Sequence, residues 1–361
     1  MLGDSLEEEI TFTVPKNVFY NPQMTLCRSI SSLAVGAVKQ DLELVDAFCA
    51  TGIRGIRYVK ENKNVTHITF LDIEKTAITA AKKNAKTNNL KFDAKYGNIS
   101  KLAFELTADF LEIDPFGTPS PYLVDAFRFF NPKKTAYLSI TATDVAVLCG
   151  ARMAPCLKNY HAKPLNNEFT HETGLRILIK RIAEVAAEFN MGIEPLISFS
   201  DKHYLKTILK VSRSADLVHK SMKELGHVYY CNTCGFRGFS QFPQPCTKCN
   251  KETDFAGPLW LGELHNPSFL KTMKTLNSKR NYSEKDEISH MLSLMENEVG
   301  MPPYYYNIHV LSKFLRRGQI PKIDTIISRL QKDFKATRTH FSNISIKTNA
   351  PYDKILEAME C

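Results

Sequence analysis

The residues with the most direct chemical potential are Asp114, Pro115, Phe116 and Gly117, which follow one another in the chain. They come directly after residues 109–113, an apolar run that predicts a short strand. Proline has no backbone N–H and glycine permits unusual dihedral angles, so the strand should end here. In an open parallel sheet, ligands bind outside the carboxyl ends of the strands. The motif therefore predicts a carboxylate and an aromatic ring beside a ligand; the alternative is a turn in which Asp114 bonds its own backbone.

A second chemical signal comes from four of the nine cysteines, which form two Cys-x2-Cys pairs: Cys231 with Cys234, and Cys246 with Cys249. Four thiolates at about 2.3 Å from one ion make a closed tetrahedral zinc site. The glycines and prolines between the pairs are typical of a zinc ribbon, which we place at about residues 226–255. A redox pair is the alternative, but it does not explain two pairs. Because four thiolates leave no open coordination position, the predicted zinc is structural.

Basic residues concentrate near the C-terminus of a chain whose formal net charge is +9. Residues 309–349 contain nine lysines and arginines against two aspartates. The nine are Lys313, Arg316, Arg317, Lys322, Arg329, Lys332, Lys335, Arg338 and Lys347. A basic stripe confined to one domain is the electrostatic footprint expected of a nucleic-acid-binding protein. The alternative is a solvated helical face without a partner.

Length and composition set the broad class. A chain of 361 residues can form two domains, and 43% hydrophobic with 24% charged residues is ordinary for a globular protein. The acidic N-terminus lacks the apolar region of a signal peptide, and no run approaches the ~18 apolar residues of a membrane span. We therefore expect a cytoplasmic protein with reduced cysteines and no membrane association. No feature indicates an obligate protein partner.

The elements that must position these residues begin with a buried strand at residues 42–48. A turn of small residues containing Gly52 follows, and then a helix at about residues 53–61. Such a strand, turn and helix allow the backbone to approach a bound cofactor closely. A second strand, residues 67–71, ends at Asp72, which lies at the sequence distance from Gly52 where an acidic residue meets a ribose hydroxyl pair.

Strands and helices then alternate, with further strands at residues 91–96, 109–113 and 135–141. A terminal hairpin is predicted at residues 193–200 and 204–212. Five strands followed by an antiparallel pair is the order of class I methyltransferases, and alternation of this kind predicts a doubly wound α/β sheet. Ala50 stands where a dinucleotide fingerprint has glycine, which favours an adenosyl cofactor; a dinucleotide and a fold without a cofactor are the alternatives.

The predicted fold class is α/β: a Rossmann-like methyltransferase sheet with a zinc-ribbon insertion and a basic α+β C-terminal domain. We expect the methyltransferase domain at residues 1–263. The C-terminal domain, at residues 264–361, should be mainly helical and carry the basic stripe.

An ordered set of motifs spans nearly the whole chain. They are FYNP at 19–22, DAFCATGIRG at 46–55, DPFGTP at 114–119, TATD at 141–144, LCG at 148–150, HETGLR at 171–176, GPLW at 257–260, ATRTHF at 336–341 and KTNA at 347–350. With these motifs the chain resembles the tRNA guanine-26 N2-dimethyltransferase family, in its compact archaeal-type form. The resemblance implies a tRNA substrate and S-adenosylmethionine as methyl donor, giving N2-methyl- and N2,N2-dimethylguanosine.

The resemblance also assigns roles to residues of this chain. It implies cofactor contacts for Arg28, Asp46, Gly52, Arg54, Asp72 and Ile73, with Asn98 and Ile99 beside the adenine. It implies that Asp114 and the Pro115 carbonyl accept from the guanine amine while Phe116 and Phe19 stack on the base. The basic residues expected to contact tRNA are Arg316, Arg317, Arg338 and Lys347. Two departures are Cys-Arg-Ser at 27–29, where the family usually has Asn-Arg-Asp, and Gly97-Asn98, where it usually has an acidic residue followed by alanine.

The chemistry of the acceptor gives Asp114 a defined task. The lone pair of a guanine exocyclic amine is delocalised into the ring, so the amine needs hydrogen-bond acceptors and a proton sink. The base lies within a folded RNA and must be turned out of its stack, which costs a few kcal/mol. Phosphate contacts from the basic stripe would offset that cost. Two other functions remain: methylation of an amine in another nucleic acid or a protein amide, and RNA binding by a catalytically dead zinc-ribbon protein.

Overall fold

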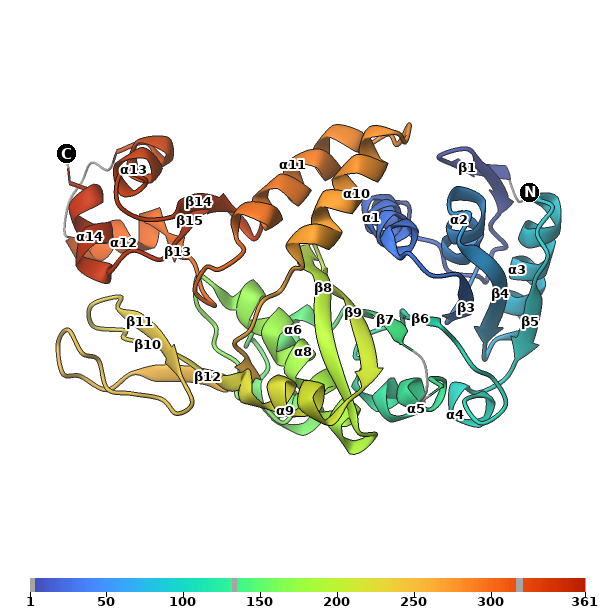
Figure 1. The fold of residues 1–361 in the computed structure, drawn as a ribbon, viewed down its shortest axis with the longest axis horizontal. Coiled ribbons are helices and arrows are strands. Elements are labelled where there is room, and N and C mark those ends of the chain that lie inside the picture. Colours follow the sequence, from blue (N-terminus) through green and yellow to red (C-terminus); the bar gives the residue numbers. More distant parts are fainter. Residues whose placement is uncertain (1–3, 132–134, 316–320, 361) are drawn as a thin grey trace.

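The computed structural model describes residues 4–131, 135–315 and 321–360. Its centre is a seven-stranded sheet with the order β5-β4-β3-β6-β7-β9-β8 (Figure 1). The strands are β3 (Leu42–Ala47), β4 (Val65–Asp72), β5 (Asp93–Tyr96), β6 (Phe110–Ile113), β7 (Ala136–Ala142), β8 (Met191–Asp201) and β9 (Tyr204–Arg213). Strands β3 to β7 pair in parallel, whereas β9 pairs antiparallel with both β7 and β8. This confirms the predicted methyltransferase sheet, including the terminal antiparallel hairpin.

The strand order reverses between β3 and β6, which lie side by side although β4 and β5 come between them in the chain. Asp46 pairs with Glu112, and Ala47 pairs with Ile113. The turn after β3 and the turn at Asp114 therefore leave the sheet at neighbouring positions. Ligands of open α/β sheets bind at this kind of switch point.

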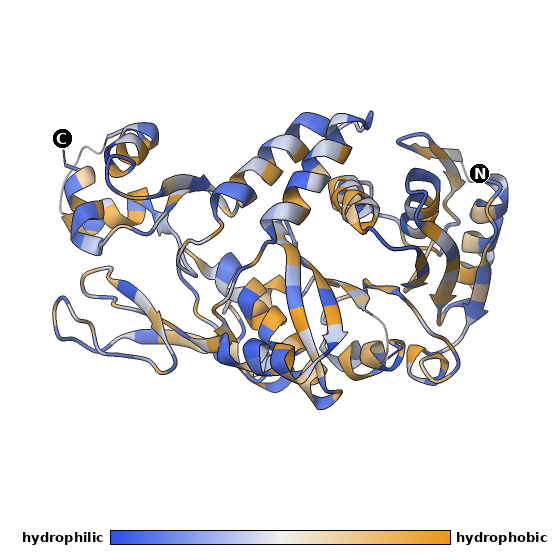
Figure 2. Ribbon diagram, viewed as in Figure 1, coloured by the Kyte–Doolittle hydropathy of each residue, from blue (hydrophilic) through white to orange (hydrophobic). Residues whose placement is uncertain are grey.

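Two hydrophobic cores lie on the two faces of the sheet because successive strand residues point in opposite directions. Leu44, Phe70 and Phe110 belong to one core, and their neighbours Val45 and Leu111 belong to the other. Figure 2 shows hydrophobic residues along the strands and on one side of the surrounding helices. These helices are α1 (Thr25–Ala37), α2 (Ile53–Glu61), α3 (Lys75–Thr87), α4 (Ile99–Leu102), α5 (Leu123–Arg128), α6 (Val145–Leu148), α7 (Met153–Tyr160), α8 (Thr170–Glu188) and α9 (Ala215–Lys223).

Several elements were not predicted. The chain opens with a two-stranded hairpin, β1 (Asp4–Glu7) and β2 (Ile10–Thr13), before the short turn η1 (Pro22–Met24) and α1. The ribbon region forms an antiparallel sheet of the order β11-β10-β12. Its strands are β10 (Leu225–Tyr230), β11 (Arg237–Ser240) and β12 (Asp254–Trp260).

The remaining elements form the C-terminal part. A three-stranded sheet has the order β13-β15-β14, from β13 (Tyr306–Asn307), β14 (Ala336–Thr339) and β15 (Ser342–Thr348). The helices are α10 (Pro267–Ser278), α11 (Lys285–Asn297), α12 (Ile308–Leu315), α13 (Ile323–Leu330) and α14 (Tyr352–Ala358), with η2 (Ser120–Tyr122) earlier in the chain. None of the described helices is long and apolar enough to cross a membrane.

Contacts cross the predicted boundary at residue 263 in both directions. Helices α10 and α11 place Leu270 and Leu292 in the same core as Ile30 of α1. In the other direction, Arg237 of the ribbon donates to the Tyr305 carbonyl, at 2.6 Å. Figure 1 shows the ribbon beside the C-terminal sheet at one end of the molecule. The two-domain division stays a prediction, and the structure shows that its parts share cores.

Candidate active site and metal site

A cavity of about 400 Å³ lies at the carboxyl ends of β3, β4 and β6. It brings together most of the residues predicted to act on a cofactor or substrate. Those that line it are Phe19, Arg28, Asp46, Arg54, Asp72, Ile73, Asp114, Pro115 and Phe116. The sequence distance between the first and last of these shows that only the fold assembles the site.

The turn after β3 holds its backbone in an unusual conformation. Gly52 has φ +76°, and a Cβ atom there would lie 3.0 Å from Ala81. Phe48 and Ala50 also have positive φ, at 65° and 48°. Such strain in non-glycine residues persists where the surrounding structure enforces it, often beside a ligand. Phe48, Ala50 and Thr51 of this turn line the cavity, and the close approach of their backbone to a cofactor stays a prediction.

Asp46 braces this turn from the strand. Its Oδ2 accepts a hydrogen bond from the backbone N–H of Gly55 at 3.0 Å. Burial and the neighbouring Glu112 carboxylate raise the pKa of Asp46 to about 7, although Arg54 lowers it. The carboxyl group therefore titrates in the neutral range while it stays within the cavity wall.

Asp72 stands at the end of β4, where the sequence placed a ribose contact. Its Oδ2 accepts from the Ala50 N–H at 3.0 Å, and its Oδ1 accepts from the Glu74 N–H at 2.9 Å. An ionised carboxylate has about four acceptor positions, so each oxygen keeps capacity for another donor. Asp72 lines the cavity with this remaining acceptor capacity, and its ribose contact stays a prediction.

Asp114 pairs with Arg54 of α2: the Arg54 Nη2 donates to the Asp114 Oδ2. The Asp114 side chain is 23% exposed, and that of Arg54 is 8% exposed. Burial raises the pKa of Asp114, but the Arg54 guanidinium and then the Lys206 ammonium outweigh it, so the pKa falls below its usual value. Asp114 is therefore an ionised acceptor at neutral pH.

Thr143 fixes the turn that follows Asp114. The Gly117 N–H donates to the Thr143 Oγ1 at 2.8 Å, and the Thr143 N–H donates to the Gly117 carbonyl at 3.0 Å. Gly117 has φ +77°, which explains the glycine. Since Thr143 supplies these contacts, the carboxylate of Asp114 is not needed to hold its own turn.

Two aromatic rings stand at the mouth of the cavity. Phe19 and Phe116 meet edge to face, with centroids 4.7 Å apart, and are 53% and 77% exposed. Solvent-exposed rings of this kind can stack on an unpaired base. A second edge-to-face pair, Phe48 with Tyr122, has centroids 4.8 Å apart and also lines the cavity. This second pair was not predicted, because Phe48 was considered only as part of the strand and motif at its position and Tyr122 lies outside every motif.

Arg28 lines the cavity, but its guanidinium already donates hydrogen bonds to other groups of the protein. Its Nε donates to the Glu7 Oε1 at 2.6 Å, and its Nη2 donates to the Asn21 carbonyl at 3.1 Å. Glu7 also pairs with Arg57 of α2 at 2.9 Å. The acidic residues at the N-terminus were used only as evidence against a signal peptide. The ion pairs that Glu7 forms with Arg28 and Arg57 were therefore not predicted. The β1–β2 hairpin therefore ties α1 and α2 together behind the cofactor turn.

Gly52, Asn98 and Ile99 are not among the residues that line the cavity. Gly52 shapes the turn through its positive φ and does not itself line the cavity. The Asn98 Oδ1 accepts from the Ser100 N–H at 2.8 Å and caps α4. Ile99 is buried in the core beside the sheet. The predicted adenine contacts of Asn98 and Ile99 stay a prediction.

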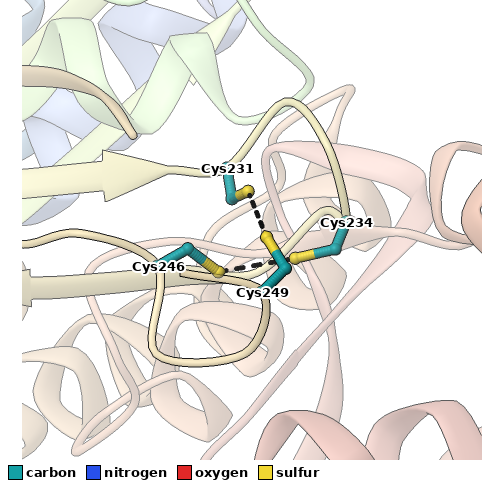
Figure 3. Close-up of side chains that lie close together, drawn as sticks. All are labelled: Cys231, Cys234, Cys246 and Cys249. Atoms are coloured by element: carbon teal, nitrogen blue, oxygen red, sulfur yellow. Dashed lines mark hydrogen bonds between the residues drawn. The ribbon is translucent and has the colours of Figure 1, made fainter. Parts of the chain in front are cut away.

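The four predicted metal ligands converge in the ribbon. Their sulfur atoms all lie within 4.8 Å of one another. Cys231 with Cys249, and Cys234 with Cys246, each have Sγ–Sγ distances of 3.5 Å (Figure 3). A tetrahedral ion with bonds of about 2.3 Å separates its sulfur ligands by roughly 3.8 Å. A disulfide would bring two sulfurs to about 2.05 Å. The cluster therefore fits a structural zinc ion.

A second buried group, His265, Glu298 and His340, also lies within 4.8 Å. The His340 Nδ1 lies 2.9 Å from the Glu298 Oε1, so the Nε2 keeps its lone pair. The Ser198 N–H points at the His265 Nδ1, at 3.5 Å, which places the ring proton on Nε2. The His265 Nε2, the His340 Nε2 and the Glu298 Oε2 have no hydrogen-bond partner among the described residues, and we assign this group no function.

The basic residues divide into different environments. The Arg338 side chain is 35% exposed and pairs with Asp324 at 2.8 Å. The Lys347 side chain is only 2% exposed, and its Nζ lies 2.6 Å from the Glu172 Oε1. β15 turns this side chain into the interior, where it is paired; the predicted tRNA contact of Lys347 stays a prediction. Arg316 and Arg317 lie outside the described residues.

Comparisons with known proteins show the family of the chain. A sequence model described as N2,N2-dimethylguanosine tRNA methyltransferase matches residues 4–360. The tRNA (guanine(26)-N(2))-dimethyltransferase of Methanobrevibacter smithii is 34% identical over 356 residues, covering 95% of this chain and 91% of that protein. The protein of the same name from Thermococcus kodakarensis is 36% identical over 367 residues, covering 95% and 93%.

A solved structure agrees over the full length. Trm1 from Pyrococcus horikoshii, in complex with S-adenosyl-L-methionine, aligns with a TM-score of 0.91 and 30% identity. The alignment covers 100% of both chains. The chain belongs to the N2,N2-dimethylguanosine tRNA methyltransferase family.

Proposed function

We propose that this protein transfers methyl groups from S-adenosylmethionine to the N2 amine of guanine 26 in tRNA, giving N2-methyl- and N2,N2-dimethylguanosine. One observation carries the proposal. An ionised Asp114 stands at the strand switch point, between a strained cofactor turn and two exposed aromatic rings. This arrangement suits an amine acceptor that must meet a methyl donor within one cavity.

The residues of the cavity fit the cofactor. S-adenosylmethionine supplies an electrophilic methyl group on a sulfonium centre. Asp72 would bind the ribose hydroxyls, because its two oxygens are held apart by backbone donors and keep acceptor capacity. The strained turn at Phe48, Ala50 and Gly52 brings backbone close to the bound molecule. Arg54 contributes a positive charge beside the cavity.

Asp114 would accept the proton that the guanine amine loses during methyl transfer. Its Oδ2 pairs with Arg54, and the carboxylate has further lone pairs for the N2–H groups of guanine. Accepting a hydrogen bond increases electron density on the amine nitrogen, and the carboxylate then takes up the proton that the methylated amine loses. The Pro115 carbonyl would accept from the second N–H. The second methyl addition starts from a nitrogen with one N–H, which Asp114 would accept after it has released its first proton, and no N–H then remains for the Pro115 carbonyl.

Phe19 and Phe116 would stack on the guanine after it leaves the RNA stack. Aromatic stacking is worth about 1–3 kcal/mol per base, which is similar to the cost of turning one base out. Arg338 is a proposed phosphate contact, because its side chain is part-exposed in the C-terminal sheet. We also propose a cytoplasmic location, because the substrate of the family is tRNA.

The experiment uses labelled S-adenosylmethionine with two unmodified tRNA transcripts, one carrying guanine and one adenine at position 26. We expect N2-methylated and N2,N2-dimethylated guanosine from the first transcript alone, identified after nuclease digestion. Equal incorporation into both transcripts would place the modified nucleoside elsewhere. Absence of incorporation, with tRNA still bound, would favour an RNA-binding protein without catalysis.

A further inference from the structure

A buried ion pair lies directly behind the active site and has no part in the mechanism above. Lys206 of β9 and Glu112 of β6 both have fully buried side chains, and the Lys206 Nζ lies 2.5 Å from the Glu112 Oε1. Lys206 also donates to the Thr141 Oγ1 at 2.9 Å, and Tyr58 donates to the Glu112 Oε2 at 2.8 Å. Replacing such a pair by hydrophobic residues is often neutral or stabilising. Its presence here therefore calls for an explanation other than stability.

The pair continues toward the cavity as a chain of alternating charge. Glu112 lies on β6, and Asp114 directly follows the end of this strand at Ile113; Arg54 contacts both carboxylates. Arg54 lies between them: its Nε is 3.8 Å from the Glu112 Oε1, and its Nη2 bonds the Asp114 Oδ2. The order is therefore Lys206, Glu112, Arg54 and Asp114, from the interior to the cavity.

We propose that Lys206 is a positioning residue for Asp114: it neutralises Glu112 so that the Arg54 guanidinium stays against the catalytic carboxylate. Without Lys206, Glu112 would carry an uncompensated negative charge and would attract Arg54 away from Asp114. The Lys206 ammonium is also the second positive charge that lowers the pKa of Asp114, after Arg54 itself. The proposal rests on the methyltransferase activity proposed above.

The groups that face this chain come from every packed element. They are Asp46 on β3, Glu112 on β6, Lys206 on β9, Arg54 and Tyr58 on α2, and Cys27 on α1, whose Sγ lies 3.8 Å from Arg54. Burial and the Glu112 carboxylate raise the pKa of Asp46 to about 7. Its titration must be separated from that of Asp114 in any pH profile.

The test is the pH dependence of kcat for methyl transfer at saturating S-adenosylmethionine and tRNA. In Lys206→Met, the acid limb should move up by about one pH unit, which lowers the rate about tenfold on that limb and leaves the alkaline plateau unchanged. The double variant Lys206→Met, Glu112→Gln should move most of the way back, because no uncompensated carboxylate then competes for Arg54. The series is repeated with Asp46→Asn, which removes the second ionisation.

Lys180→Met is the matched control. The Lys180 side chain is also fully buried; it pairs with Glu184 at 2.8 Å and donates to the carbonyls of Tyr160 and His161. Losing it should reduce stability without moving the acid limb. A Lys206→Met profile that moves no more than the Lys180→Met profile, or a double variant that moves further than Lys206→Met, would overturn the positioning role. Absence of guanine methylation by the unaltered protein would overturn the proposed function and this role with it.

Discussion

Two clusters of buried charge in this protein have similar composition and different surroundings. Behind the active site, Lys206 and Glu112 lead through Arg54 to Asp114. Between α8 and β15, Glu172 accepts from both Arg176 and Lys347, at 2.9 and 2.6 Å. Each cluster joins strands or helices that are far apart in the chain.

The clusters differ in how they end. Asp114 opens into the cavity with 23% of its side chain exposed. In the second cluster, Arg176 instead donates to the carbonyls of Trp260 and Gly262, at 2.9 and 2.8 Å, and its side chain is only 3% exposed. One network of buried charge therefore reaches a cavity, whereas backbone carbonyls close the other. Variants at each end test this distinction.

Replacing Asp114, where the first cluster opens into the cavity, should have the largest effect on activity. In Asp114→Asn, we expect kcat for methyl transfer to fall by about 10³-fold, because the amide cannot take up the proton from the amine. Calorimetry should find S-adenosylmethionine and tRNA binding retained, since the turn itself is held by Thr143. Turnover close to that of the unaltered protein would remove Asp114 from the mechanism.

Breaking the closed cluster should affect stability instead. Lys347→Met leaves the Glu172 carboxylate without one of its cations, so the free energy of unfolding in denaturant should fall by about 3 kcal/mol. The control is Lys354→Met, because Lys354 pairs with Glu357 on the surface with a 52% exposed side chain. That variant should lose far less stability, because water screens an exposed ion pair. If Lys347→Met instead changed the salt dependence of tRNA binding, this result would support the predicted contact between Lys347 and tRNA.

The zinc ribbon differs from both clusters, because a structural metal ion rather than an ion pair is expected to hold its loops together. Cys246→Ser should release the bound zinc, measured by metal analysis, and lower stability by roughly 2 kcal/mol or more. The effect should reach the C-terminal part, because Tyr352 donates to the Cys234 carbonyl at 2.5 Å. Cys156→Ala removes a buried thiol outside the cluster and should keep the full zinc content. Equal zinc content in both variants would contradict the four-cysteine site.

The smallest expected effect concerns an exposed pair. Arg338→Glu should weaken tRNA binding severalfold and reduce the slope of log K against log salt by about one. Arg128→Glu is a matched control, because Arg128 is likewise 35% exposed and pairs with an aspartate, Asp125, outside the C-terminal part. If both charge reversals changed the slope equally, the C-terminal stripe would have no special part in binding.

Much of the site could be predicted from the sequence because its signals are local. β6 ends at Ile113, directly before the Asp-Pro-Phe-Gly turn, and Gly52 with Asp72 marks the predicted cofactor turn. The spacing of the four cysteines predicts the metal site directly. Parallel strands end at one edge of a sheet, so these short motifs were expected to meet there.

Other parts were decided by tertiary structure alone. Lys206 reaches Glu112 because β9 pairs with β7 beside β6, a relation that no local pattern encodes. Lys347 belongs to a basic stripe in the sequence but is buried against α8, because net charge does not say which side chain faces inward. Sequence determined which chemical groups are present and where strands end; packing determined which charges are paired, since long-range pairing depends on contacts between distant segments.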